Sequence, residues 1–167
     1  MTAPPSPELD FLDTAPIRLH RSAIVGVTKD RLFAVVAEQP AEWGHWCPGF
    51  TTASRWTTSG PPAVGSKRTM RAFGTDFRET VLAFDEGARF TFRVDESKVP
   101  VLRPFALVED WTFESVEDSA TPKTRVTWSM AADSVLPAAV MGSFLKGFQT
   151  VLMKGAVRRL ERRYGRS

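Results

Sequence analysis

Between Phe50 and Ser129, apolar residues recur at every second position in six successive runs. A period of two is typical of half-buried β-strands. The turns between the runs are short and rich in Gly, Pro and Asp, so they leave no room for crossover helices, and an antiparallel sheet of sequential neighbours is expected. The runs are TTASRWTTS, SKRTMRAF, DFRETVLAF, ARFTFRV, ALVEDWTFESV and TRVTWSM.

The segment before these runs predicts one more strand and two short helices. Residues 17–27 alternate well enough for a strand, and Thr28 is a suitable N-cap for a helix over residues 31–37. Pro40 then separates this helix from a second one over AEWGHW, which ends before Pro48.

After the runs, residues 137–164 carry apolar residues at steps of three and four, which predicts a helix of roughly 40 Å. Ser134 is its expected N-cap, with Pro137 in the first turn. The apolar stripe comprises Val140, Met141, Phe144, Leu145, Phe148, Val151, Leu152, Ala156, Leu160 and Tyr164. This helix is the only element large enough to cover a seven-stranded sheet, so an α+β fold follows, with a curved antiparallel sheet wrapped on a long C-terminal helix. Gly142 and Gly147 either leave room for a ligand between helix and sheet or allow close packing there.

Length and composition limit the alternatives. The chain has 167 residues, 43% of them hydrophobic, which favours one domain over residues 17–167 preceded by a flexible leader over residues 1–16. Cys47 is the single cysteine, so neither an intramolecular disulfide nor a cysteine-rich zinc site is expected. No signal peptide, membrane-spanning run or glycine-rich phosphate loop is visible. We therefore expect a cytoplasmic monomer or homodimer with no metal, no cofactor and no membrane insertion.

Positive charge gathers at the end of the chain. The formal net charge is +3, but the segment from Lys154 onward alone carries +5. Such a segment binds nucleic acid or an anionic membrane, or it is simply the solvated face of a helix. No aromatic residues lie between the arginines, so we expect the solvated face and no nucleic-acid partner.

Several stretches resemble the helix-grip (SRPBCC) superfamily, which includes START lipid-transfer domains, birch-pollen-allergen proteins and polyketide cyclases/dehydrases. These stretches are VTKDRLFAVVAE with the Trp43–Pro48 segment, GPPAVGSKR, FRETVLAFDEGARFTFRV, VEDWTFESV and TRVTW. The resemblance is to the cyclase/dehydrase-like branch and covers residues 17–164. It implies binding of a small hydrophobic or aromatic molecule, such as a lipid or a polyketide-like compound, in an internal pocket. The protein would then act as a carrier or sensor, or alternatively as a cyclase/dehydrase-type enzyme.

Glu109 is the first candidate for acid–base chemistry. It shares a strand face with Leu107, Trp111 and Phe113, so its carboxyl would be desolvated and its pKa raised, unless an arginine such as Arg71 or Arg93 pairs with it. His45 is the second candidate, because an imidazole at a pocket rim titrates near neutral pH; the alternative is a solvent-exposed histidine on a helix. Glu79 either faces inward or forms a surface ion pair with Arg68 or Arg93, and we expect the surface pair.

The remaining candidates are the residues expected to line the pocket. Trp43 and Trp46 either stack on a flat ligand or cap the core. The full predicted ligand-binding set is Trp43, Trp46, Met70, Arg71, Phe90, Phe92, Leu107, Trp111, Phe113, Trp128, Phe144, Gly147 and Phe148. Residues 98–104 contain two prolines and are expected to form an extended loop that closes over the pocket.

Overall fold

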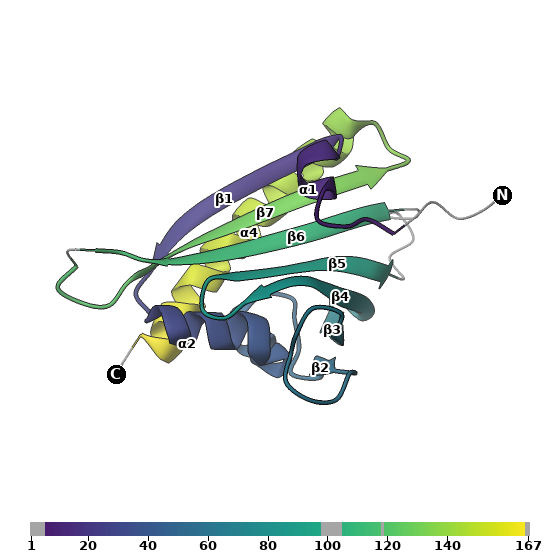
Figure 1. Cartoon of the computed structure of the whole chain (residues 1–167). Coiled ribbons are helices and arrows are strands. Elements are labelled where there is room, and N and C mark those ends of the chain that lie inside the picture. Colours follow the sequence, from purple (N-terminus) through teal and green to yellow (C-terminus); the bar gives the residue numbers. More distant parts are fainter. Residues whose placement is uncertain (1–5, 98–104, 118, 166–167) are drawn as a thin grey trace.

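The computed structural model describes residues 6–97, 105–117 and 119–165, so the proposed lid over residues 98–104 lies outside the described residues. Seven strands form one antiparallel sheet in the order β1-β7-β6-β5-β4-β3-β2 (Figure 1). The strands are β1 (Ile17–Val25), β2 (Arg55–Trp56), β3 (Lys67–Ala72), β4 (Thr75–Asp85), β5 (Arg89–Ser97), β6 (Phe105–Ser115) and β7 (Thr124–Ser134). The seven-stranded antiparallel sheet predicted from the sequence is therefore confirmed.

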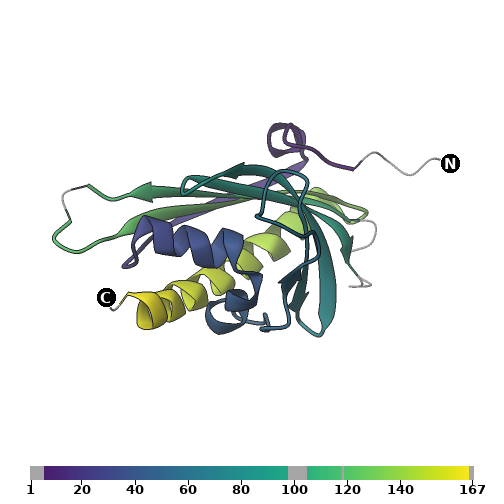
Figure 2. The same ribbon diagram turned by 60° about the horizontal axis from the view of Figure 1, so that its bottom comes forward.

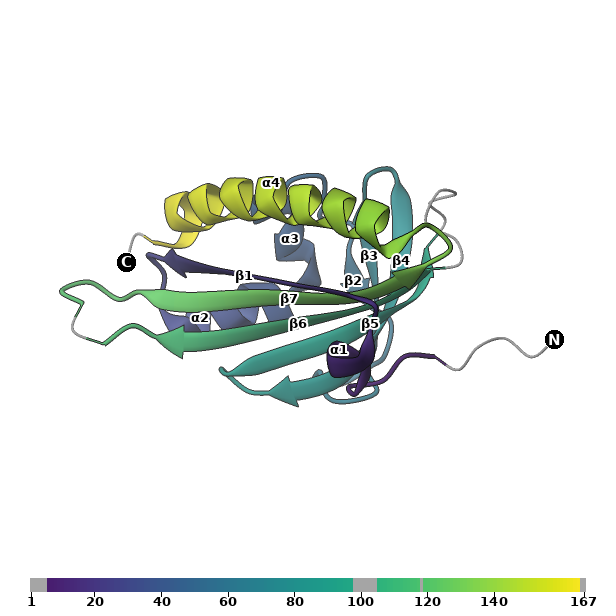
Figure 3. The ribbon, with the colours of Figure 1, turned by 90° about the horizontal axis from the view of Figure 1, so that it is seen from above.

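One long helix, α4 (Ala138–Tyr164), lies across the concave face of the sheet (Figures 2 and 3). The short helices between β1 and β2 lie on the same side. They are α2 (Lys29–Phe33), η1 (Ala34–Glu38), η2 (Pro40–Glu42) and α3 (Trp43–Trp46). Side chains from the sheet, α4 and these helices share one hydrophobic core. Each large apolar side chain buried there stabilises the fold by about 1.5–3 kcal/mol.

A further short helix, α1 (Phe11–Thr14), lies on the opposite, outer face of the sheet (Figure 3). Phe11 and Leu12 pack there against a small apolar cluster formed by Leu82, Val108 and Ala131. This contact anchors the second half of the N-terminal segment to the sheet.

The predicted cap of the long helix is wrong. Antiparallel pairing with β6 extends β7 as far as Ser134, so this residue belongs to the strand. Its hydroxyl accepts a hydrogen bond from the Leu136 N–H at 3.1 Å, and Pro137 occupies the N-cap position instead.

The predicted apolar stripe on α4 is broader than the face that the sheet covers. Met141, Leu145 and Leu152 are buried, whereas Val140, Phe144 and Val151 are exposed on the opposite side of the helix. A single sheet covers only one side of a helix, which leaves this second set of apolar residues facing solvent.

Candidate functional site

Two charged side chains meet inside the core. Arg68 on β3 lies directly opposite Glu79 on β4, and its Nε donates to Glu79 Oε2 at 2.6 Å. Both side chains are buried. Burial raises the pKa of Glu79, while the charge and hydrogen bond of Arg68 lower it in part. Arg68 is one of the two partners expected for Glu79, but the expected surface position is wrong.

A β-bulge explains that error. The pairing of β4 with β5 shifts between Val81 and Ala83, so residues on either side of this point do not follow one alternation. Phe77 and Val81 face the core together with Glu79, and after the bulge Phe84 also packs against the core. The sequence therefore shows apolar residues at both odd and even positions, which obscures the face of Glu79.

The Arg68 guanidinium lies among aromatic rings. Its Cζ is 4.7 Å from the ring centroids of both Phe90 and Phe92, and 5.3 Å from that of Trp43. Nη1 donates to the Val36 carbonyl at 3.4 Å. Nη2 is buried and has no hydrogen-bond partner in the described part of the chain. Cation–π attraction offsets some of the desolvation cost of the charge, but not the missing hydrogen bond.

Glu109 on β6 faces the same interior. Burial is the main cause that raises its pKa to about 8, and the charge of Glu79 raises it further. The hydrogen bond from Trp128 Nε1, at 2.8 Å to Oε2, and the charge of Arg68 act in the opposite direction. Near neutral pH the carboxyl is therefore mostly protonated, and it provides an O–H donor inside an apolar environment.

The alternative partners considered for Glu109 bind elsewhere. Arg71 forms an exposed ion pair with Asp76 at 3.0 Å. Arg93 donates to Asp95 at 2.7 Å. The charge that acts on Glu109 is that of Arg68, which the sequence analysis did not assign to it.

A second buried donor lies beside Glu109. The Trp111 ring stacks on that of Trp128, with centroids 5.0 Å apart and an interplanar angle of 15°. The Trp111 indole lowers the pKa of Glu109, but within residues 6–97, 105–117 and 119–165 its N–H meets no acceptor in hydrogen-bond geometry. A buried unpaired donor costs about 1–3 kcal/mol. Arg68 Nη2 is thus an unpaired donor in the interior, and Trp111 Nε1 is a second donor that acts on Glu109 without forming a well-aligned hydrogen bond.

Aromatic rings connect this interior with the surface. Successive centroids lie between 4.9 and 6.2 Å apart. We call this chain of rings the aromatic track, and in order of contact it comprises Phe144, Phe148, Phe73, Phe50, Trp43 and Trp111, of which Phe144 and Phe73 are exposed. Phe73, at the turn between β3 and β4, has a φ of 51°, a left-handed conformation that is strained for a non-glycine residue.

Most residues predicted to bind ligand are indeed in the interior. The buried ones are Trp43, Trp46, Met70, Phe90, Phe92, Leu107, Trp111, Phe113 and Trp128. Phe148 is half-buried, whereas Arg71, Phe144 and Gly147 are exposed, so these three do not line the interior. Gly147 faces solvent, and no atom lies within 4 Å of the position that its Cβ would take. It therefore does not create space for a ligand between helix and sheet.

His45, the second candidate, is exposed on α3. It therefore does not assemble an acid–base pair with Glu109.

Two residues of the interior escaped the sequence analysis. Arg68 alternates with Met70 and Ala72 on the core face of β3, and this period of two was the available signal. Gln149 of α4 is buried and donates from Nε2 to the Trp128 carbonyl at 2.8 Å, which holds α4 against β7. Its position on the apolar side of the helix was the corresponding signal.

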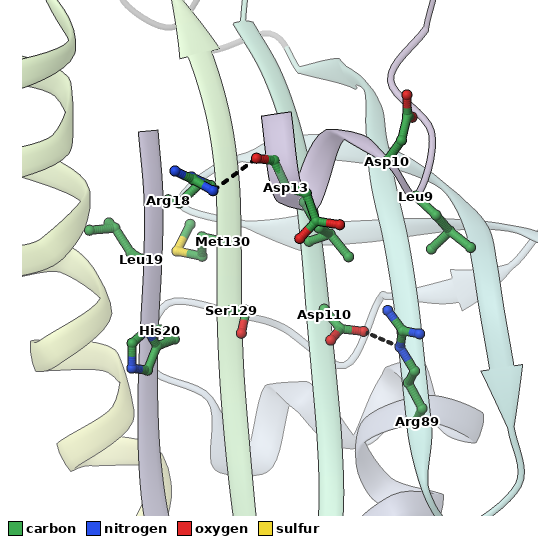
Figure 4. A pocket seen from close by; sticks show the side chains of 11 residues that line it. Leu9, Asp10, Asp13, Arg18, Leu19, His20, Arg89, Asp110, Ser129 and Met130 are labelled. Atoms are coloured by element: carbon green, nitrogen blue, oxygen red, sulfur yellow. Dashed lines mark hydrogen bonds and ion pairs between the residues drawn. The ribbon is translucent and has the colours of Figure 1, made fainter. Parts of the chain in front are cut away.

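Two surface hollows lie outside this interior. One, of about 530 Å³, lies on the outer face of the sheet beneath α1 (Figure 4). Charged groups of both signs line it, and there the Arg89 Nε donates to Asp110 at 2.8 Å. The other, of about 440 Å³, lies between the start of α2 and the β6–β7 connection. Neither is lined by the residues predicted to bind ligand.

The described residues offer little for binding a metal ion or for nucleophilic attack by a thiolate. Among the described residues no group of three or more His, Cys, Asp or Glu is placed to hold a metal ion. Burial raises the pKa of the Cys47 thiol well above its usual value, so a thiolate nucleophile is disfavoured. In the same part of the chain no helix is long and apolar enough to cross a membrane.

A curved antiparallel sheet that wraps around one long C-terminal helix is the helix-grip fold. The family described as "Polyketide cyclase / dehydrase and lipid transport" matches residues 16–165, and the chain belongs to this family. The resemblance drawn from the sequence motifs is thereby confirmed.

The chain is also similar to a curated relative in sequence and to solved structures in fold. The uncharacterized protein Rv2574 of Mycobacterium tuberculosis is 28% identical over 131 residues, which cover 78% of this chain and 74% of that protein. A START superfamily protein from Mycobacterium smegmatis has a TM-score of 0.70 at 12% identity, with 87% of this chain and 97% of that chain covered. The major latex-like protein 151 of Panax ginseng has a TM-score of 0.67 at 14% identity, with 88% and 96% covered. At these identities the two solved structures show the fold alone.

Proposed function

We propose that the protein binds a small, neutral, hydrophobic or aromatic molecule between the sheet and α4 and acts as a carrier or sensor. The observation that carries this proposal is the pair of buried donors, Arg68 Nη2 and Trp111 Nε1, that lack a well-aligned hydrogen bond in the described part of the chain. A guest with carbonyl or hydroxyl oxygens would satisfy them, and the surrounding rings would contact its apolar part.

Charge favours a neutral guest. Arg68 and Glu79 neutralise each other, and Glu109, with its pKa raised to about 8, is mostly uncharged near neutral pH. An ionised guest would add an unbalanced charge to a desolvated interior, which is costly. Polyketide-like compounds and lipids with neutral oxygen-bearing groups fit this requirement.

Binding requires side chains to move, because rings of the core fill the interior. The aromatic track marks the route, since it leads from the exposed Phe144 and the half-buried Phe148 to Trp111 beside Glu109. In this proposal the protein works in the cytoplasm, as a monomer or homodimer and without a nucleic-acid partner. Residues 17–167 form its single domain after a leader over residues 1–16.

A second candidate function is that of a cyclase/dehydrase-type enzyme. It is favoured by the raised pKa of Glu109, which keeps a proton available near neutral pH for a departing hydroxyl or a carbonyl oxygen. An acid–base mechanism also needs a proton acceptor. Glu79 is held by Arg68, and His45 and Arg71 are exposed, so the interior offers no second free group among the described residues. The carrier or sensor therefore remains the leading proposal.

Native mass spectrometry of the purified protein tests the proposal directly, since a bound small molecule adds a defined mass. Binding of 1-aminoanthracene, an uncharged fluorescent aromatic probe, is compared in the wild type, Glu109→Gln and Glu114→Gln. Glu114 is an exposed carboxylate of the same strand and is the matched control.

We expect one probe per chain and weaker binding in Glu109→Gln only. A wild type that neither retains a small molecule nor binds the probe would contradict the proposal. If the protein converts a polyketide-like substrate and only Glu109→Gln abolishes the conversion, the enzyme replaces the carrier.

A further inference from the structure

The solvent face of α4 carries one continuous stripe. Its members follow each other at steps of three and four residues, so they project from one side of the helix. All of them are exposed, and they are Val140, Phe144, Gly147, Val151, Lys154, Arg158 and Arg162. The first half of this stripe is apolar and the second half is basic.

Further exposed apolar side chains surround the apolar half. Val135 and Leu136 lie in the loop that leads into α4, and Phe73 contacts Phe148 of the helix with ring centroids 5.6 Å apart. Of the nine large apolar side chains that are exposed among the described residues, six are gathered here. The exposed fractions of Val140, Phe144 and Val151 are 58%, 56% and 69%. Solitary exposed apolar residues are ordinary, but such a cluster marks an interaction surface.

The positive charge of the basic half is not balanced by ion pairs in the described part of the chain. Within residues 6–97, 105–117 and 119–165, Lys154, Arg158 and Arg162 have no ion-pair partner. Glu161 is the single acidic residue of α4, and its carboxylate accepts the Gly26 N–H at 2.9 Å. The exposed side of the helix therefore presents positive charge next to an apolar cluster.

We infer that this stripe is a docking surface for an anionic lipid bilayer, with α4 lying along the membrane surface. The cations of the second half contact lipid phosphates, while Phe144 and its apolar neighbours enter the boundary between headgroups and acyl chains. The helix does not span the membrane. Docking at this face also turns the surface end of the aromatic track toward the lipid.

Charge distinguishes this partner from a second copy of the chain. Two copies paired through the whole stripe would bring two uncompensated basic halves into one interface, and like charges oppose that arrangement. An anionic bilayer offers negative charge to the basic half and apolar volume to the other half. Nucleic acid would leave Phe144, Val140 and Val151 exposed.

Co-sedimentation of the full chain with vesicles tests the inference. Phosphatidylcholine vesicles with and without phosphatidylglycerol are compared, and no interior ligand is added. We expect binding only when phosphatidylglycerol is present, with a decrease as salt is raised. Removing Lys154, Arg158 and Arg162 together by substitution with Gln should weaken binding about a hundredfold, at roughly fivefold per charge. The control variant replaces Arg55, Lys67 and Lys123 with Gln in the same way. These exposed cations lie elsewhere in the fold, so the control removes the same charge and should weaken vesicle binding much less.

The apolar half is tested in the same assay. Phe144→Gln should weaken binding about tenfold or more, because a phenyl group no longer enters the lipid. Val64→Gln, in the β2–β3 connection, is the control for an equally exposed apolar residue. The inference would be overturned if the two triple variants weakened vesicle binding equally. It would also be overturned if the wild type bound equally well to vesicles with and without phosphatidylglycerol. A third contradicting result would be a dimer of the wild type, seen by sedimentation velocity, that does not bind vesicles and that Phe144→Gln dissociates.

Discussion

Trp128 Nε1 donates to Glu109 Oε2 at 2.8 Å, and the two residues are diagonal neighbours on the adjacent strands β7 and β6. The register pairs Glu109 with Met130 and Trp111 with Trp128, so the indole of Trp128 reaches a carboxyl two register positions away on the same face. This contact fixes one oxygen of a carboxyl whose pKa is raised to about 8.

Protein stability should therefore depend on pH through Glu109. In the unfolded chain its pKa is near the usual 4.5, and in the folded protein it is raised to about 8, so the folded state holds a proton that the unfolded state loses. Its contribution is fully present below pH 4.5 and is lost as the pH rises through about 8. The free energy of unfolding should fall by up to about 1.4 kcal/mol per pH unit within this window. Urea titrations across the window measure this slope.

Glu109→Gln provides the comparison. An amide keeps an oxygen for the Trp128 N–H and cannot ionise, so the slope should become smaller, while Glu114→Gln should leave it unchanged. The pKa of Glu79 is also raised, which leaves some slope in both variants. Identical slopes in the wild type and Glu109→Gln would show that Glu109 titrates normally.

Arg68→Met should destabilise the protein by about 3–5 kcal/mol, because it leaves the Glu79 carboxylate buried without its cation. The double variant Arg68→Met with Glu79→Leu should recover most of this loss, since no buried charge remains. Arg71→Met removes an exposed ion pair with Asp76 and should cost less than about 1 kcal/mol. Urea unfolding measures all three, and a double variant no more stable than Arg68→Met would contradict a buried pair.

Phe148→Ala should speed access to the interior, because the half-buried Phe148 packs between two exposed rings, Phe144 and Phe73, at the surface end of the aromatic track. Stopped-flow fluorescence with 1-aminoanthracene should show a faster association rate. Val151→Ala shortens an exposed side chain of the same helix and is the control. Unchanged association in Phe148→Ala would mean that the probe reaches the interior by another route.

Two glycines of α4 should respond in opposite directions to substitution by alanine. Gly147→Ala meets nothing within 4 Å and should stabilise the protein by up to about 1 kcal/mol. Gly155→Ala would place a Cβ 2.7 Å from Pro48 Cγ and should destabilise it. Thermal unfolding distinguishes them, and a stabilised Gly155→Ala would show that Pro48 does not pack closely on α4.

The elements of the fold were predictable because each follows one simple period. The two-residue alternation placed Phe90, Phe92 and Trp128 correctly in the interior, and it placed Glu109, which is half-buried, on the same core-facing side. The second predicted strand shrinks to Arg55–Trp56.

The position of Glu79 was not predictable from alternation, since the bulge after Val81 changes the face of later residues. Nor could alternation show that Arg68 reaches the Val36 carbonyl in η1, which is a contact between distant parts of the chain. On α4, a stripe of apolar residues does not reveal which of them the sheet covers, so Phe144 was assigned to the wrong side.

The side-chain hydrogen bonds that tie α4 to the rest of the described chain begin at its middle. They join Gln149 to Trp128, Thr150 to Arg21, Glu161 to Gly26 and Tyr164 to Glu42. Residues 138–148 are held mainly by apolar contacts such as those of Met141 and Leu145. The first part of α4, which carries Phe144 and Phe148 of the aromatic track, is therefore held by packing rather than by these hydrogen bonds. If a guest enters along the aromatic track, this part of the helix is the one that must yield to admit it.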